Sequence, residues 1–271
     1  GTVVNWATSF RTPPKVLQHW NTAWGLTELT EGKLAPWFAA IEKRMSIKTW
    51  SGSPNANNAV LQRGLQNLGL KWGKISPNVK GCANLGYCGM GCPINAKQST
   101  LVANLPVAMA AGARLYHRLR AQNFTFNSNK TQITSLVCDA LDRSGLEPSG
   151  RKVTITARHY VLAAGAINGP ALLMRSDAPD PYGTLGKRSF LHPSPSVGGI
   201  HPGQIKAWDG LPQSVYSDHY LDDKPITGEL GWKLEVAPLQ PVLVAISTAY
   251  FGDNHLNVMR NYDKYASVIS F

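Results

Sequence analysis

Three glycine-containing segments combine residue types that could bind a ligand or carry out chemistry. The first is the run Gly1-Thr2-Val3-Val4-Asn5-Trp6-Ala7-Thr8-Ser9. Glycine has no Cβ and lets a ligand approach the backbone closely, while Asn and Thr supply short donors and acceptors. The composition therefore suits a loop along the edge of a flat, polar ligand, although an ordinary surface turn has the same composition.

The second segment, 81–100, contains three cysteines within eleven positions: Cys82, Cys88 and Cys92. Thiols this close suggest a metal or iron–sulfur site. A structural zinc site takes four ligands, usually in close pairs, and cluster ligation needs a fourth thiolate. The remaining cysteine, Cys138, lies in a predicted strand, and no histidine lies near the loop. Buried structural thiols, or one disulfide among the three, are therefore favoured over a metal.

The third segment, 156–173, is an apolar run followed by Ala163-Ala164-Gly165 and a predicted helix. A strand that ends in a turn of small residues before a helix brings backbone beside a dinucleotide. The alternative is a buried core strand and its turn.

The hydrophobic periodicity predicts the elements that hold these segments. Helices are expected over 34–47, 57–70, 97–111 with a kink at Pro106, 170–174 and 253–262. Strands are expected over 114–126, 133–140, 153–162, 197–200, 227–236, 242–250 and 266–271. The order predicts an α/β (α+β) chain, with part of a Rossmann-like FAD/NAD(P)-binding domain followed by an antiparallel-sheet substrate domain.

The three segments, in this order and with these gaps, resemble the glucose-methanol-choline (GMC) family of FAD-dependent oxidoreductases. The Asn5-Trp6 form of the first loop, with its Arg11-Thr12-Pro13 ending, is similar to the long-chain fatty alcohol oxidase branch. The Gly-Tyr-Cys-Gly-x-Gly-Cys run over 86–92 is similar to the same branch. The third segment resembles the family's second signature, but Arg175-Ser176-Asp177 replaces the Ser-Gly that usually ends it.

The resemblance implies a cofactor, FAD, and a set of residues that contact it. These are Gly1, Thr2, Asn5, Trp6, Ala7, Thr8, Ala121, Ala164 and Gly165, with the backbone of Ala121 facing the adenine. It also implies four parts: a flavin loop over 1–14, a helical cap or substrate-domain part over 15–80, an FAD-binding part over 81–190 and a substrate-binding part over 191–271.

The implied activity is oxidation of an alcohol, long-chain or bulky and apolar, to an aldehyde or ketone. The flavin would take the hydride and pass electrons to oxygen or another acceptor. The family's catalytic histidine lies in a motif near the C-terminus, and none of the seven histidines here is in such a motif, so the catalytic residues stay unassigned. We expect an internal piece of a larger enzyme, because a pyrophosphate-binding Gly-x-Gly-x-x-Gly is not found either.

Other functions stay open. The chain could be a non-catalytic or split flavoprotein subunit, a metal or redox protein built on the cysteine loop, or another flavoprotein such as a disulfide reductase.

Nucleic-acid binding is not expected, because the net charge of +11 comes from scattered Lys and Arg rather than a basic face. No hydrophobic run is long enough to cross a bilayer. Localisation and membrane association are left unassigned, as is use of the glycosylation sequons at Asn123 and Asn129.

Overall fold

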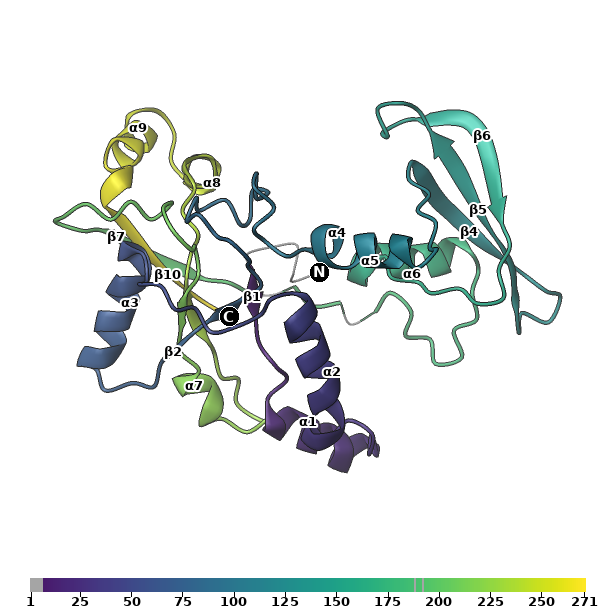
Figure 1. The fold of residues 1–271 in the computed structure, drawn as a ribbon, viewed down its shortest axis with the longest axis horizontal. Helices are drawn as coiled ribbons and strands as arrows, with labels where there is room; N and C mark the ends of the chain where they lie inside the picture. The colour runs from purple at the N-terminus through teal and green to yellow at the C-terminus, as the bar shows by residue number, and fades with distance from the viewer. Residues whose placement is uncertain (1–6, 188, 192) are drawn as a thin grey trace. The chain divides into compact units, whose positions relative to one another are not determined.

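The computed structural model in Figure 1 describes residues 7–187, 189–191 and 193–271. The chain forms two compact units. The large unit comprises Gly1–Ala111 and His192–Phe271, and the small unit comprises Gly112–Leu191. Among the described helices, none has both the length and the apolar character needed to span a bilayer. The predicted four-part functional division stays a prediction.

The large unit combines helices with short antiparallel sheets. Its first stretch contains β1 (Thr8–Ser9), α1 (Pro14–Trp24), α2 (Glu31–Arg44), α3 (Ala56–Asn67), β2 (Gly73–Lys74), β3 (Ser76–Pro77), α4 (Thr100–Ala103) and α5 (Leu105–Ala110). Its second stretch contains β7 (Ser196–Ile200), β8 (Val215–Tyr216), α7 (His219–Asp222), β9 (Leu234–Val236), α8 (Pro241–Ser247), α9 (Gly252–Arg260), the 3-10 turn η2 (Tyr262–Lys264) and β10 (Tyr265–Ser270). The sheets are β7-β10-β9, β1-β3 and β2-β8.

One face of the β7-β10-β9 sheet packs on α3. Leu61 and Leu65 on α3 form a buried cluster with Val215 and Val236. Because side chains alternate across a strand, residues 235, 267 and 269 project from the opposite face. Figure 1 shows α8 and α9 on the other side of β7 and β10 from α3.

Polar residues at the start of α3 join segments that are distant in sequence. The side chain of Asn58 is fully buried, and its Oδ1 accepts from the backbone N–H of Ser214 at 2.8 Å and of Val215 at 3.0 Å. Its Nδ2 donates to the carbonyl of Pro212 at 3.0 Å. Buried backbone groups must find partners, so this one amide fixes the turn that leads into β8.

Asn57, the preceding residue, does the same for the sheet. Its Oδ1 accepts from the N–H of Ser267 at 3.0 Å, and its Nδ2 donates to the carbonyl of Ala237 at 3.2 Å. Asn57 is 1% exposed. The helix therefore holds β10 and the chain after β9 by hydrogen bonds as well as by apolar packing.

The small unit is an antiparallel sheet with one helix. Its strands are β4 (Leu119–Phe126), β5 (Ile133–Leu141) and β6 (Pro148–Ile155), in the order β4-β5-β6, and α6 (Gly165–Arg175) packs on β4. Ser176, after α6, accepts from the N–H of Phe124 at 2.8 Å and donates to the carbonyl of Leu172 at 2.6 Å. The predicted α/β mixture of helices and sheets is confirmed.

Two predicted strands are wrong in extent or type. The strand expected over 153–162 ends at Ile155, because β6 pairs only with β5 and its last partner pair is Leu136 with Ile155. The strand expected over 242–250 is instead the helix α8. Pro241 occupies its first turn, where the missing N–H costs nothing, and the N–H of Val244 bonds the carbonyl of Gln240.

Other boundaries also shift. The helix expected from Pro170 begins five residues earlier, at Gly165, with the proline inside it. The helix over 97–111 is broken at Asn104 into α4 and α5, close to the predicted kink at Pro106. The strand over 227–236 is reduced to Leu234–Val236.

Replacing Asn58 by leucine is expected to destabilise the fold strongly. The change leaves the N–H groups of Ser214 and Val215 without their buried acceptor, at about 1–3 kcal/mol for each buried group. Denaturant unfolding followed by tryptophan fluorescence measures the loss, and we expect about 3 kcal/mol or more. The matched control is Asn67→Leu at the exposed end of the same helix. Equal stability of the two variants would contradict the role given to Asn58.

Candidate functional site

The strand pair β1–β3 positions the end of the first glycine-containing loop. Thr8 pairs with Pro77 and Ser9 with Ser76, and the N–H of Asn78 donates to the carbonyl of Ala7 at 3.1 Å. Ala7 itself is completely buried. The loop therefore enters the large unit through a short ladder that fixes its backbone.

Ala7 has a backbone conformation that alanine rarely adopts. Its φ is +66°, in the left-handed region, where a residue with a Cβ loses roughly 1–2 kcal/mol relative to the right-handed form. The methyl group packs in a cluster with Val79, Cys88 and Leu211, which holds it there. Strain of this kind is concentrated at ligand sites.

Three buried polar atoms around this strand pair have no hydrogen-bond partner among the described residues. They are Ser9 Oγ, Trp50 Nε1 and Asn78 Oδ1. Asn78 is fully buried, and its Nδ2 donates to the carbonyl of Gln98 at 2.9 Å, so its Oδ1 is the atom left without a partner. Each unmet group costs about 1–3 kcal/mol, so the site favours a ligand that supplies both donors and acceptors.

Two cavities adjoin the strand pair. One, of about 420 Å³, is lined by Ser9 and Ser76 together with Arg11 and Glu42. The other, of about 650 Å³, is lined by Trp50, Pro77, Val79, Gly81 and Cys82, among others. Both volumes are in the range of small-molecule sites, and both cavities are bounded by the segment 47–49.

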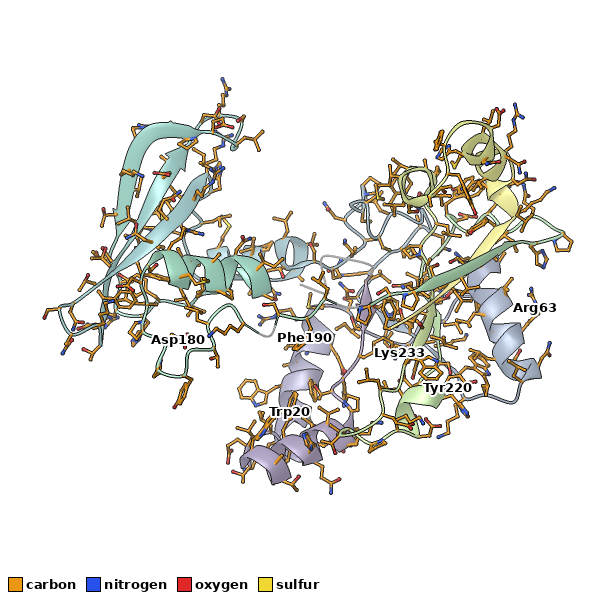
Figure 2. The ribbon with its side chains drawn as sticks, turned by 180° about the vertical axis from the view of Figure 1, so that it is seen from behind. Trp20, Arg63, Asp180, Phe190, Tyr220 and Lys233 are labelled. Carbon is orange, nitrogen blue, oxygen red and sulfur yellow. The ribbon has the colours of Figure 1, made fainter. Side chains whose placement is uncertain are left out.

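Phe10, the residue after β1, contacts the ammonium group of Lys233 and the ring of Tyr216. The ammonium group of Lys233, labelled in Figure 2, lies 3.9 Å from the centre of the Phe10 ring and 4.3 Å from that of Tyr216. It also forms an ion pair with Asp218 at 2.5 Å. The two rings meet edge to face at 5.0 Å. This ion pair is partly buried, so it holds the ammonium group against the two rings more firmly than a fully exposed pair would.

The cysteine loop is tied to the same unit through Gly86. Its carbonyl accepts from Nε2 of Gln240 at 2.6 Å, and a Cβ at this position would lie 1.8 Å from the carbonyl oxygen of Trp208. With a φ of +71° as well, the position requires glycine. The described residues contain no group of three metal-ligating side chains placed to hold a metal ion.

The thiols in this loop differ in acidity. Burial raises the pKa of Cys88 to about 11, and its two neighbouring thiols add to the effect. Partial burial also disfavours ionisation of Cys92. The backbone N–H groups of Lys97, Ile94 and Ala96 and the charge of Lys97 outweigh it and lower the Cys92 pKa. Cys92 is thus the more reactive thiol of this pair.

The structure describes five of the nine predicted cofactor contacts. Ala7 and Thr8 lie in the large unit, at the strand pair. Ala121, Ala164 and Gly165 lie in the small unit. The other four predicted contacts, Gly1, Thr2, Asn5 and Trp6, lie outside the described residues.

Within the small unit the three predicted contacts lie at opposite ends of α6. Ala164 and Gly165 form its exposed start, where Gly165 has a φ of +80° and open space around it. The carbonyl of Ala121 on β4 accepts from Nη2 of Arg175, the last residue of the helix, at 3.4 Å. An eleven-residue helix is about 16 Å long, so one compact ligand group cannot contact both ends.

Sequence reasoning missed Asn78, Trp50 and Glu235. Glu235 on β9 is 5% exposed, and burial raises its pKa to about 7. The charge of Lys233 opposes this shift, and that of Asp218 adds to it. An acidic residue between two apolar ones in a predicted strand is the only sequence signal for Glu235, and it is a weak one.

Comparisons with known proteins bear on this site. A family model described as GMC oxidoreductase matches residues 1–194. An uncharacterised GMC-type oxidoreductase of Mycobacterium tuberculosis is 29% identical over 224 residues, which are 82% of this chain and 34% of that protein. Long-chain-alcohol oxidase FAO4B of Arabidopsis thaliana is 27% identical over 229 residues, 82% of this chain and 30% of its own. The chain thus spans about a third of the length of these curated relatives.

Alkylation should distinguish the thiols. At neutral pH iodoacetamide is expected to modify Cys92 at least about tenfold faster than Cys88 or Cys138, because the thiolate is the reactive form and burial raises the pKa of the other two. Mass spectrometry of timed samples measures the order. In guanidinium chloride all four thiols should react alike. Equal rates in the folded protein would contradict the pKa difference.

The buried carboxyl group of Glu235 should make stability depend on pH. Its folded pKa of about 7 exceeds the ordinary 4.5, so the folded state binds more protons than the unfolded state between these values. Stability then falls as pH rises from 4.5 to 7. The stability of Glu235→Gln relative to the unmodified protein should therefore increase as the pH is raised from 5 to 8, by on the order of 3 kcal/mol in total. Thermal melts measure this, with Glu28→Gln, at an exposed carboxylate, as control. A gain that does not depend on pH would contradict the shift.

Proposed function

The chain belongs to the GMC oxidoreductase family, and from this premise we propose that it forms part of an FAD-dependent enzyme that oxidises an alcohol to an aldehyde or ketone. The observation that carries the proposal is the strained, buried end of the first loop beside three buried polar groups that lack partners. When bound, FAD supplies the acceptor for the two electrons that leave the alcohol carbon.

The residues at the strand pair fit this cofactor. An isoalloxazine ring and its ribityl chain present both hydrogen-bond donors and acceptors. Asn78 Oδ1 would accept from such a group, Trp50 Nε1 would donate to one, and Ser9 Oγ can do either. Ala7 and Thr8 would bring backbone against the ring.

The small unit contains the other described residues that we propose as FAD contacts. The exposed N–H groups at the start of α6, with Ala164 and Gly165, suit a phosphate. The backbone of Ala121, at the other end of the helix, would face the adenine. Gly1, Thr2, Asn5 and Trp6 complete the proposed set of contacts.

We propose a long-chain or bulky apolar alcohol as the substrate. The names of the Arabidopsis relatives, long-chain-alcohol oxidases, support this class. Oxygen or another small acceptor would reoxidise the cofactor. The base that takes the hydroxyl proton stays unassigned among the described residues.

Spectroscopy on the full-length protein tests the function. We expect visible flavin absorption, release of FAD on denaturation, and loss of the absorption when primary alcohols are added without oxygen. A colourless protein, or a flavin that stays oxidised with every alcohol, would contradict the proposal.

A matched pair of variants tests the binding residues without relying on turnover. Asn78→Leu removes the acceptor oxygen and should weaken FAD retention by about tenfold. Asn67→Leu, on the exposed end of α3, should retain FAD normally. Equal FAD affinities, measured by equilibrium dialysis, would remove Asn78 from the site.

A further inference from the structure

A separate cavity lies on the sheet face away from α3. It has a volume of about 400 Å³ and is bounded by β7, β10, the chain after β9, α8 and α9. Its walls are largely aliphatic and aromatic, with Leu239, Leu243, Val244, Val258 and Ile269 among them. The polar atoms in its lining are mainly hydroxyl groups. Walls of this kind select a hydrocarbon rather than a charged ligand.

A glycine in the floor of this cavity accommodates the ring of Tyr265. Gly198 on β7 pairs with Ser267 on β10. A Cβ at Gly198 would lie 2.5 Å from the hydroxyl oxygen of Tyr265. The glycine therefore makes room for the Tyr265 ring over the strand, and the ring forms part of the cavity wall.

One face of the β9 segment links the cavity to the first-loop site. Lys233, Glu235 and Ala237 project from the same face, because alternate residues of a strand do so. The ladder extends to Lys233, whose N–H and carbonyl exchange hydrogen bonds with Phe271. At one end of this row Lys233 contacts the ring of Phe10, the residue after β1. At the other end Ala237 lines the cavity.

Glu235 lies between these two ends. It pairs with Ile269, which also lines the cavity. Glu235 is 5% exposed, and the charged groups that influence its pKa are Lys233 and Asp218. Lys233 is engaged with Asp218. The neighbouring strands β10 and β7 present Ile269 and Ser196, which are uncharged.

We propose that an alcohol with a long hydrocarbon chain binds along this face of β9, with its chain in the cavity and its hydroxyl group at the carboxyl group of Glu235. This inference rests on the proposed function and names the part of the molecule that recognises the substrate. A buried acid whose strand partner, Ile269, lines an apolar cavity suits a ligand with one small polar group that can donate and accept. A hydroxyl group meets that requirement.

The location of the hydroxyl group follows from the same row of residues. Lys233 and Phe10 lead from Glu235 to Ser9 and Ala7, where the flavin loop ends. An alcohol anchored at Glu235 would have its polar end toward the proposed cofactor site and its chain directed away from it. The size of the cavity, rather than the residues that contact the cofactor, would then determine which alcohol chain lengths are accepted.

Steady-state kinetics of the full-length flavoprotein tests this assignment, with primary alcohols from butanol to hexadecanol. Ala249 is an exposed residue that lines the cavity after α8. Ala249→Phe should lower kcat/KM for hexadecanol by about tenfold or more, while butanol changes less than about twofold. Ser247→Phe, which enters the same cavity from α8, should do the same and serves if the first variant does not fold. Ile246→Phe, an exposed neighbour on α8 outside the cavity lining, is the matched control.

Glu235→Gln provides the second readout. A bound hydrocarbon removes the remaining water from the carboxyl group, so binding favours its neutral form. With a pKa of about 7, the KM of the unmodified protein should rise by about tenfold from pH 6 to pH 8. The glutamine variant, which stays neutral and keeps a donor and an acceptor, should show no such rise.

The outcomes separate the two proposals. If alcohols reduce the flavin but the cavity variants leave the chain-length profile unchanged, the cavity assignment is overturned and the proposed function stands. An identical pH dependence of KM in Glu235→Gln removes the carboxyl group from the assignment. If no alcohol reduces the flavin of the unmodified protein, the proposed function and this inference both fail.

Discussion

The large unit depends on two buried amide side chains at the start of α3. Asn57 and Asn58 satisfy backbone groups of three segments that lie about 150 to 210 residues further along the chain. Apolar packing of Leu61 and Leu65 against Val236 brings the sheet and helix together, but it does not select a register. The amides do, because each accepts or donates at defined backbone positions, and a buried group left unpaired costs more than a typical hydrogen bond contributes. The positions of β8, β9 and β10 follow from them, and with these strands the positions of Lys233, Glu235 and the apolar cavity.

How well the sequence predicts the fold depends on how local the determinants are. The helix α3 and the strands β5 and β10 have clear periodicity and lie close to their predicted bounds. The segment 242–250 is rich in Val, Ile and other apolar residues, which favours a strand, yet Pro241 and the bond from Val244 to Gln240 begin a helix there. The segment 156–162 has a strand-like composition, but the partner strand β5 reaches no further than Ile155. In both cases the outcome depends on a neighbour that periodicity does not identify.

The candidate site divides in the same way. Glycine and short polar residues mark the first loop in the sequence, and the strained backbone of Ala7 and the strand pair lie at its described end. Asn78 and Trp50 have no local signal and Glu235 has only a weak one, because a missing hydrogen-bond partner and a raised pKa arise only from tertiary burial. The cysteine spacing marks the loop over 81–100 in the sequence. The backbone N–H groups that lower the Cys92 pKa are placed beside its thiol only in the folded loop.

We propose that the strand pair β1–β3 and its unpaired polar groups bind FAD. Amide hydrogen exchange, compared between the FAD-loaded protein and the same protein stripped of flavin, tests this most directly. We expect slower exchange over 7–9 and 76–79 when FAD is bound, with little change in α1, which lies outside the proposed contacts. Tight binding of FAD with unchanged exchange in these two segments would contradict it.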